Sequence, residues 1–107
     1  MSQQEKDNLV FKALANETRR TILDALKPGP LTTSALAELL PDLDRTTVMQ
    51  HLNVLVKADL VIVARRGRER WNHLNALPIQ AIHERWIGEF AGYSADRLAK
   101  LKRDLES

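Results

Sequence analysis

The sequence contains no cysteine, and this absence excludes several kinds of chemistry at once. Disulfide bonds, thiolate metal sites and thiol redox sensing all need a cysteine sulfur. No apolar run approaches the roughly 18 residues that suggest a membrane span, and residues 1–6 lack the character of a signal peptide. We therefore expect a cytoplasmic protein with no membrane partner.

Catalytic and cofactor motifs are also missing. The sequence has no glycine-rich phosphate loop, no nucleophile beside a base and no carboxylate pair in an evident cleft. His83 and Glu84 are adjacent on an expected helix, so their side chains point in different directions and do not suit a shared metal site. His73, beside Trp71 on an expected strand, is predicted to pack. We expect no enzyme activity, no cofactor and no metal site.

The composition is that of an ordinary globular protein. Of its 107 residues, 44% are hydrophobic and 28% are charged. This length predicts one domain over residues 1–107 with a modest core, small enough for an oligomer interface to matter. We find no internal repeat and no low-complexity segment.

The small net charge of +2 is distributed unevenly along the chain. Residues 1–43 hold five Lys and Arg against six Asp and Glu, and residues 75–107 hold five against five. Residues 44–74 hold six against three, so the positive excess lies in this middle segment. A polyanionic partner should therefore be bound by residues 44–74 and not by the whole surface.

A helix is expected over residues 44–57, within that segment. Asp44 can cap it by accepting a hydrogen bond from a first-turn amide, and Leu43 can pack on Val48 as a hydrophobic staple. One side of the helix is apolar and should face the core: Val48, Leu52, Leu55 and Val56. The opposite side carries hydroxyls, amides and a lysine: Thr46, Thr47, Gln50, Asn53 and Lys57.

The polar side of this helix has the chemistry of a DNA-reading surface. Hydroxyl and amide groups both donate and accept hydrogen bonds, which matches the edges of bases in a DNA major groove, and they also bond to phosphates. A merely solvated face is the alternative. Arg45 adds a cation at the helix start. His51 lies on the flank, where it either touches phosphate or orients the turn, and Met49 is expected to pack.

A β-hairpin is expected directly after this helix, over residues 61–74. Two β-favouring runs, 61–64 and 70–74, are joined by a short link that contains Gly67. Four arginines gather in and beside the link, and because like charges repel, folding alone does not explain them: Arg65, Arg66, Arg68 and Arg70. A helix with outward amides followed by an arginine-tipped hairpin predicts a winged helix-turn-helix.

Three further helices are expected before residue 44. The first spans about 5–15, and the second runs from 17 to about 27 with Asn16 as its N-cap. Pro28-Gly29-Pro30 ends the second helix. The third, 34–40, is capped by Thr32 or Thr33, and its core side is Leu36, Leu39 and Leu40. The helix-turn-helix therefore spans about 34–57, in a fold that is mainly α with a small β-hairpin.

The C-terminal region, about residues 78–105, is predicted to be a long amphipathic helical segment that begins with Pro78. Gly88 and Gly92 either allow another backbone to approach or mark a bend before Ser94, which could cap a separate final helix. With the first helix, this segment is expected to form a homodimer interface of Leu9, Val10, Phe11, Ile82, Trp86, Phe90 and Tyr93. The alternative is a helix that packs back on its own subunit.

With these elements placed, the sequence resembles the ArsR/SmtB family of bacterial winged-helix repressors over about residues 9–75. The resemblance lies in the segments 11–23 (FKALANETRRTIL), 36–38 (LAE), 48–55 (VMQHLNVL) and 67–68 (GR). It implies a dimer with terminal helices paired across a two-fold axis. It also implies repression at a palindromic double-stranded DNA operator, relieved by an effector whose identity the sequence leaves open.

The sequence departs from the metal-sensing members of that family. Residues 36–40 hold none of the cysteines that those members carry in the third helix, and no second histidine follows His83 at a suitable spacing. We therefore expect a cysteine-free regulator that does not sense metals. A winged helix can also serve as a protein-interaction module, but such a module has no need for four arginines in the wing.

Overall fold

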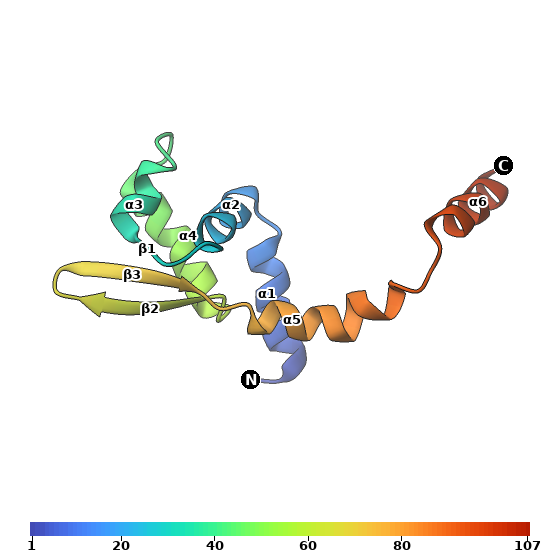
Figure 1. The fold of residues 1–107 in the computed structure, drawn as a ribbon, viewed down its shortest axis with the longest axis horizontal. Coiled ribbons are helices and arrows are strands. Elements are labelled where there is room, and N and C mark those ends of the chain that lie inside the picture. The colour runs from blue at the N-terminus through green and yellow to red at the C-terminus, as the bar shows by residue number, and fades with distance from the viewer.

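The computed structural model describes residues 1–107. Figure 1 shows that most of the helices and a small sheet form one body, with the last helix set apart from it. The order of elements is α1 (Gln3–Leu14), α2 (Glu17–Leu26), β1 (Leu31–Thr32), α3 (Thr33–Glu38), α4 (Arg45–Lys57), β2 (Val61–Arg66), β3 (Glu69–Leu74), α5 (Leu77–Ile82), the π-helical turn η1 (His83–Ile87), the short 3-10 turn η2 (Gly88–Phe90) and α6 (Ala95–Glu106). This order confirms the mainly helical fold with a hairpin wing.

Side-chain caps set the starts of the helices around the turn. Asn16 accepts a hydrogen bond from the Arg19 amide, and Asp44 accepts one from the Thr47 amide at 2.7 Å. Thr32, not Thr33, caps α3, because the Thr32 hydroxyl accepts from the Ala35 amide. The donated N–H groups have no partner inside their own helices, so each cap satisfies one of them.

The core lies where α1, α2, α3 and α4 meet the base of the wing. Its buried members are Val10, Ala13, Ile22, Leu23, Leu26, Leu36, Val48, Leu52, Leu55, Ala58, Leu60, Val61 and Ile82. Two residues predicted for the core are exposed instead, Leu39 and Val56. Leu39 lies beyond the end of α3, where the helical period no longer turns it inward, and Val56 is rotated away from the core relative to Leu55.

The sheet has a strand that the sequence did not predict. β1 pairs antiparallel with β3, so the strand order is β1-β3-β2. Asn72 of β3 is fully buried, and its Nδ2 donates to the Leu31 carbonyl at 3.2 Å and to the Thr33 hydroxyl at 3.1 Å. The base of the wing is therefore joined to the start of α3.

The turn from α4 into the wing has a left-handed residue, Asp59, with φ of 61°. The Leu60 amide donates to the Leu55 carbonyl at 2.9 Å, which ends the helix in a Schellman arrangement. Asn75 Nδ2 also donates to the Asp59 carbonyl, at 2.8 Å. These contacts set the direction in which the hairpin leaves α4.

The C-terminal region bends before Ser94, which was one of the two alternatives predicted from Gly88 and Gly92. α5 has only six residues, with proline in its first turn, and it continues as a π turn and a 3-10 turn. Gly88 ends the π turn, with its amide donating to the His83 carbonyl, and a Cβ at this position would lie only 3.1 Å from that oxygen. Ser94 then caps a separate helix, α6, by accepting from the Arg97 amide.

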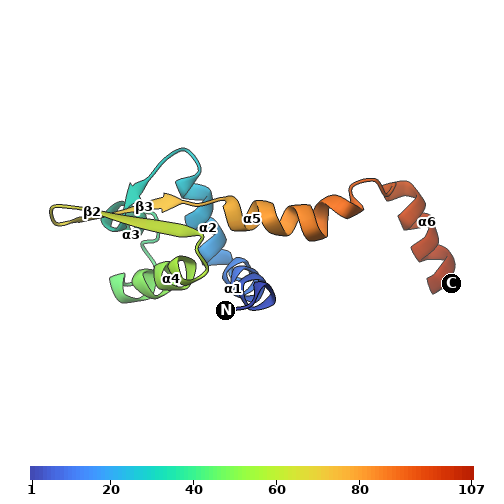
Figure 2. The same ribbon diagram turned by 90° about the horizontal axis from the view of Figure 1, so that it is seen from below.

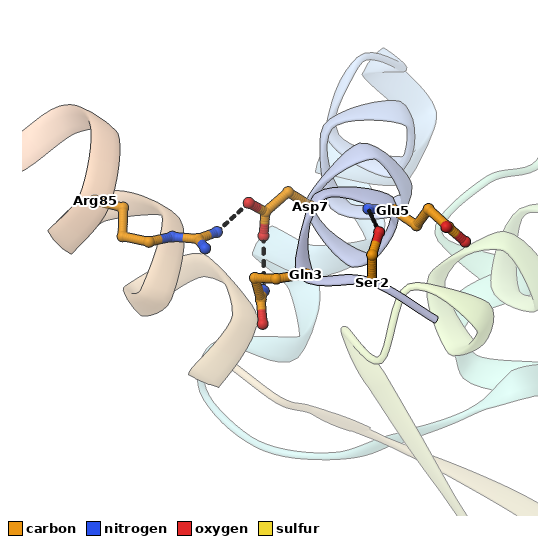
Figure 3. A network of polar contacts seen from close by, with 5 residues as sticks. All are labelled: Ser2, Gln3, Glu5, Asp7 and Arg85. Atoms are coloured by element: carbon orange, nitrogen blue, oxygen red, sulfur yellow. Dashed lines mark hydrogen bonds and ion pairs between the residues drawn. The ribbon is translucent and has the colours of Figure 1, made fainter.

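A polar network ties this region to the first helix (Figure 3). Gln3 Nε2 donates to Asp7 at 3.0 Å, and Arg85 of η1 pairs with the other oxygen of the same carboxylate. The hydrogen bond from Gln3 and the Arg85 guanidinium hold the pKa of Asp7 below its ordinary value. Ser2 caps α1 by accepting from the Glu5 amide. The two segments predicted to form the dimer interface are therefore joined within one chain.

The last helix, α6, projects away from the body in both views (Figures 1 and 2). None of its twelve residues is buried. This projection makes the chain elongated, with extents of 59 × 33 × 24 Å. None of the helices combines the length and apolar character needed to cross a membrane.

Candidate nucleic-acid interface

The predicted outward side of α4 is exposed along its length. Asp44 starts the helix, and the Thr47 amide and hydroxyl lower the pKa of its carboxyl by hydrogen bonding. Beyond it, a row of side chains is open to solvent: Arg45, Thr46, Gln50, Asn53 and Lys57. Thr47 is half-buried. The opposite side of α4 is anchored by Val48, Leu52 and Leu55, each with 0% exposure, so α4 presents its polar side on a rigid support.

The wing projects from the same end of the molecule as α3 (Figure 1). Its two strands pair from Val61 with Leu74 to Arg66 with Glu69, and the link is Gly67 and Arg68. Gly67 has φ of +62°, a conformation that costs a residue with a Cβ. Arg65, Arg66 and Arg68 are exposed, as the sequence predicted for a charged wing.

Arg70 differs from the other three wing arginines. It is half-buried, and its Nε hydrogen has no acceptor within the chain. Burial, together with the charge of Arg65 opposite it, lowers the pKa of Arg70. A guanidinium that is partly desolvated, repelled by a neighbour and short of an acceptor is stabilised by an anion.

A pocket of about 250 Å³ lies between the wing and the starts of α3 and α4. Its lining is Thr32, Thr33, Ser34, Arg45, Met49, Arg65, Arg68, Glu69 and Arg70. Arg45 donates to the Ser34 hydroxyl at 3.3 Å, which holds the two helix starts together on its wall. Four arginines face one glutamate here, so the pocket has the charge to receive a phosphate group.

The hydroxyls of that pocket were missed as candidate DNA contacts. In the sequence, residues 32–34 read only as a helix cap, because their distance from the arginines of the wing depends on how the hairpin folds back. The half-buried Met49 does pack against the core and lines the pocket as well.

His51 is engaged by a residue that the sequence did not point to. Its Nδ1 lies 3.2 Å from an Nη of Arg19 in α2. Burial, with the nearby Arg19 charge, lowers the pKa of His51. Two roles were predicted for His51, a phosphate contact or orientation of the turn. The contact with Arg19 supports the second role.

The residues predicted for a dimer interface fall into two groups. Val10 and Ile82 are each only 3% exposed and belong to the core of their own chain, so they have no surface to offer a partner. That part of the prediction is corrected: both side chains point inward because α1 and α5 pack on the body. The others leave an apolar surface, with Leu9 half-buried and with Phe11, Trp86, Phe90 and Tyr93 exposed.

The three histidines do not gather. No group of three or more histidine, aspartate or glutamate side chains lies close enough together to hold a metal ion. His83 and Glu84 lie in η1, both exposed, and His73 is half-buried in β3. The absence of metal sensing stays a prediction.

Known proteins are similar to this chain in sequence. A family model described as a helix-turn-helix domain matches residues 14–64. The transcriptional repressor SdpR of Bacillus subtilis is 37% identical over 73 residues, which cover 68% of this chain and 80% of SdpR. The HTH-type transcriptional regulator Rv2034 of Mycobacterium tuberculosis is 35% identical over 98 residues, covering 88% of this chain and 91% of that protein.

Solved structures agree. The crystal structure of an ArsR family transcriptional regulator is 35% identical, with a TM-score of 0.73, and covers 83% of this chain and 91% of its own. An ArsR-like transcriptional regulator from Rhodococcus sp. RHA1 is 30% identical with a TM-score of 0.73. It covers 99% of this chain and 97% of its own, so the likeness extends through the C-terminal region.

Proposed function

This chain belongs to the ArsR/SmtB family of winged helix-turn-helix regulators, which bind DNA sequence-specifically, and we propose that it acts as a homodimeric repressor on an inverted-repeat operator. The proposal rests above all on one arrangement. Arg45 at the start of α4 and three arginines of the wing, Arg65, Arg68 and Arg70, line the same cationic pocket. Together they form one DNA-facing surface, defined as the outward side of α4, the pocket and the wing tip.

The recognition helix α4 enters the major groove in this proposal. A helix with side chains is about 10–12 Å across, and the major groove of B-DNA is about 12 Å wide. Thr46, Gln50 and Asn53 lie on successive turns of its outward side. A glutamine amide pairs bidentately with adenine, so Gln50, at the middle of the row, is the residue we assign to base reading.

The wing binds the DNA backbone or an adjacent minor groove. Arg66 and Arg68 flank Gly67 at the tip, where their guanidinium groups are exposed. The pocket behind the wing tip, which is lined by Arg45 and Arg70, receives a phosphate of the DNA strand that the tip contacts. Phosphate contacts position a protein on DNA without reading sequence, which assigns affinity to the wing and discrimination to α4.

The homodimer is formed by the apolar surface that one chain leaves uncovered. The rings of Phe90 and Tyr93 are in tilted contact at a centroid distance of 5.8 Å, and Trp86 lies one turn before Phe90, all three more than half exposed. Grouped aromatics of this kind mark an interaction site. A closed two-fold dimer presents two copies of α4 in opposite directions, and this symmetry requires an inverted repeat.

Selection of bound duplexes from a random pool tests the proposal. We expect an inverted repeat whose half-site centres are roughly 34–36 Å apart, or a multiple of that distance. Sedimentation equilibrium should give twice the 12.2 kDa of one chain. Enrichment of direct repeats or of isolated half-sites, with a mass of 12.2 kDa, would contradict the dimer while leaving DNA binding intact.

A further inference from the structure

One guanidinium group joins three helices. Arg19, in the first turn of α2, donates from Nε to the Ala13 carbonyl and from Nη2 to the Lys12 carbonyl, both at 2.9 Å. These carbonyls belong to the last turn of α1, where backbone acceptors lack full helical partners. The remaining Nη1 lies 3.2 Å from Nδ1 of His51 on α4. Arg19 therefore contacts the first helix and the recognition helix at the same time.

The direction of the third contact follows from the chemistry of the two groups. A guanidinium only donates, so His51 must accept through an unprotonated Nδ1 and carry its proton on Nε2. The ring is then neutral. A second proton on His51 would replace the acceptor by a donor and place two cations together, so the contact exists only with the neutral imidazole.

The planar guanidinium gives this contact a fixed geometry. Its donors lie in one rigid fork, so the positions of two α1 carbonyls determine where the third donor points. His51 lies on the flank of α4, one residue after Gln50, on the recognition helix itself. A bond at this position restrains rotation and sliding of α4 relative to α1.

We propose that Arg19 and His51 form a positioning link that sets the orientation of α4 relative to α1, and through the dimer the separation of the two recognition helices. This inference rests on the proposed function, since α1 lies beside the apolar surface assigned to the dimer. Arg19 acts through His51 and touches no DNA. The link converts the geometry of the dimer into a preference for one spacing of half-sites.

Arg19 could act only by holding the end of α1, and a variant of Arg20 serves as the control for that role. Arg20, the next residue, donates to the Leu14 carbonyl at 2.7 Å and so also contacts the end of α1. Its side chain forms no hydrogen bond to α4. Replacing Arg20 by alanine therefore removes a contact to the end of α1 without touching the recognition helix.

Two substitutions of His51 isolate the link from every other role of the imidazole. His51→Leu removes the acceptor and leaves both bonds from Arg19 to α1 in place. His51→Asn puts a side-chain oxygen near the position of Nδ1, so it restores the acceptor. Both lose the Nε2–H group of the imidazole, but the Asn amide nitrogen can still donate to a phosphate, so the variants are compared by their spacing preference and not by their absolute affinity.

The measurement is affinity for three duplexes: the selected inverted repeat, and the same repeat with one base pair inserted or removed at its centre. One base pair moves a half-site by roughly 3.4 Å along the DNA and rotates it about the axis. We expect the unaltered protein to bind either altered duplex with an affinity at least tenfold lower than its affinity for the selected repeat. His51→Asn and Arg20→Ala should keep that preference, whereas His51→Leu should reduce it to threefold or less. Arg19→Lys, which keeps the charge but not the fork, should behave like His51→Leu.

Other outcomes overturn the proposal in distinguishable ways. If His51→Leu folds normally by circular dichroism and keeps the full spacing preference, the link does not set the separation. If His51→Leu and His51→Asn lose the preference equally, the imidazole acts otherwise than as an acceptor for Arg19. If the unaltered protein itself shows no preference, the proposed dimer on an inverted repeat fails, and the link has nothing to set.

Discussion

Helices α4 and α6 have similar spacing of apolar residues, but these residues are buried in α4 and exposed in α6. In α4, Val48, Leu52 and Leu55 are all 0% exposed. In α6, the leucines at 98, 101 and 105 recur at steps of three and four, yet they are 47%, 53% and 76% exposed. The difference lies in what surrounds each helix, because α4 is enclosed by the other helices of the body and α6 contacts none of them (Figure 2).

This comparison shows what an amphipathic pattern means in a small protein. An isolated helix of twelve residues is marginal in water, so α6 needs a surface to cover its leucines. The body buries most of its own apolar residues in the core, and Trp86, Phe90 and Tyr93 are among the large apolar side chains that it leaves exposed. The helix-turn-helix and the wing are therefore packed within one chain, whereas in the proposed homodimer the C-terminal region is covered by a second chain.

The largest effect should come from removing an aromatic of the C-terminal region. Trp86→Ala is expected to lose roughly 3–5 kcal/mol if the ring is fully buried in the dimer. The matched core variant, Leu52→Ala, should lose roughly 2–5 kcal/mol at any protein concentration. Thermal melting over a hundredfold range of concentration separates them, because only the interface variant changes the concentration dependence. Equal behaviour of the two would show that Trp86 does not stabilise an interface between chains.

A smaller effect is expected at the centre of the recognition helix. Gln50→Ala should weaken binding to the selected operator by roughly 1–3 kcal/mol and leave random DNA almost unaffected, because a base contact carries discrimination. Binding curves on the two duplexes at one salt concentration suffice. Equal losses on both would mean that Gln50 contacts the backbone.

Substitutions in the wing should have the opposite effect on DNA binding, lowering affinity without changing sequence preference. Arg66→Ala or Arg68→Ala should weaken operator and random DNA together, since each removes a phosphate contact. The slope of log affinity against log salt should fall by roughly one unit per lost contact. A loss of operator preference with an unchanged salt slope would assign the wing to base reading.

A pH effect should come from His51. Its pKa in the folded chain is lowered from 6.5, so the folded state takes up a proton less readily than the unfolded state does. Stability is then fully present above pH 6.5 and falls as the pH drops through that value. Urea unfolding between pH 8 and 5.5 should show the decline, and His51→Asn should flatten it. Asp7 and Asp44, whose pKa values are lowered from 3.8, stay charged over this range.

The smallest expected effect is that of metal ions. With no cysteine and no clustered set of histidines and carboxylates in the chain, zinc or cadmium at low micromolar concentration should leave operator affinity unchanged. Fluorescence anisotropy of a labelled operator measures this directly. A tenfold shift, about 1.4 kcal/mol, would reveal a site built from both chains of the dimer.

Local chemistry made the half of the molecule that holds the helix-turn-helix and the wing predictable. The caps at Asn16 and Asp44, the apolar side of α4 and the position of Gly67 in the hairpin are decided by neighbours within a few residues. Such signals are legible in a sequence because helix and hairpin periods are fixed by backbone geometry. The helix-turn-helix and its wing followed from them, with boundaries that moved by one or two residues.

Contacts between distant segments needed the folded chain. Strand β1 is two residues long and exists only because β3 returns beside it. Arg19 meets His51 across 32 positions, and Asn72 meets Thr33 across 39. No local pattern encodes such pairs, since they depend on how the helices pack.

The sequence by itself therefore determined the type, order and polarity of the main helices and of the wing hairpin, because these depend on short-range periodicity and capping. Tertiary structure decided which apolar residues found a partner. Val10 and Ile82 carry the same apolar signal as Phe11 and Trp86, but the first two are enclosed by their own chain and the last two are left exposed. Burial is a property of the whole packed body, so the division between core and interface could be drawn only once the helices were in place.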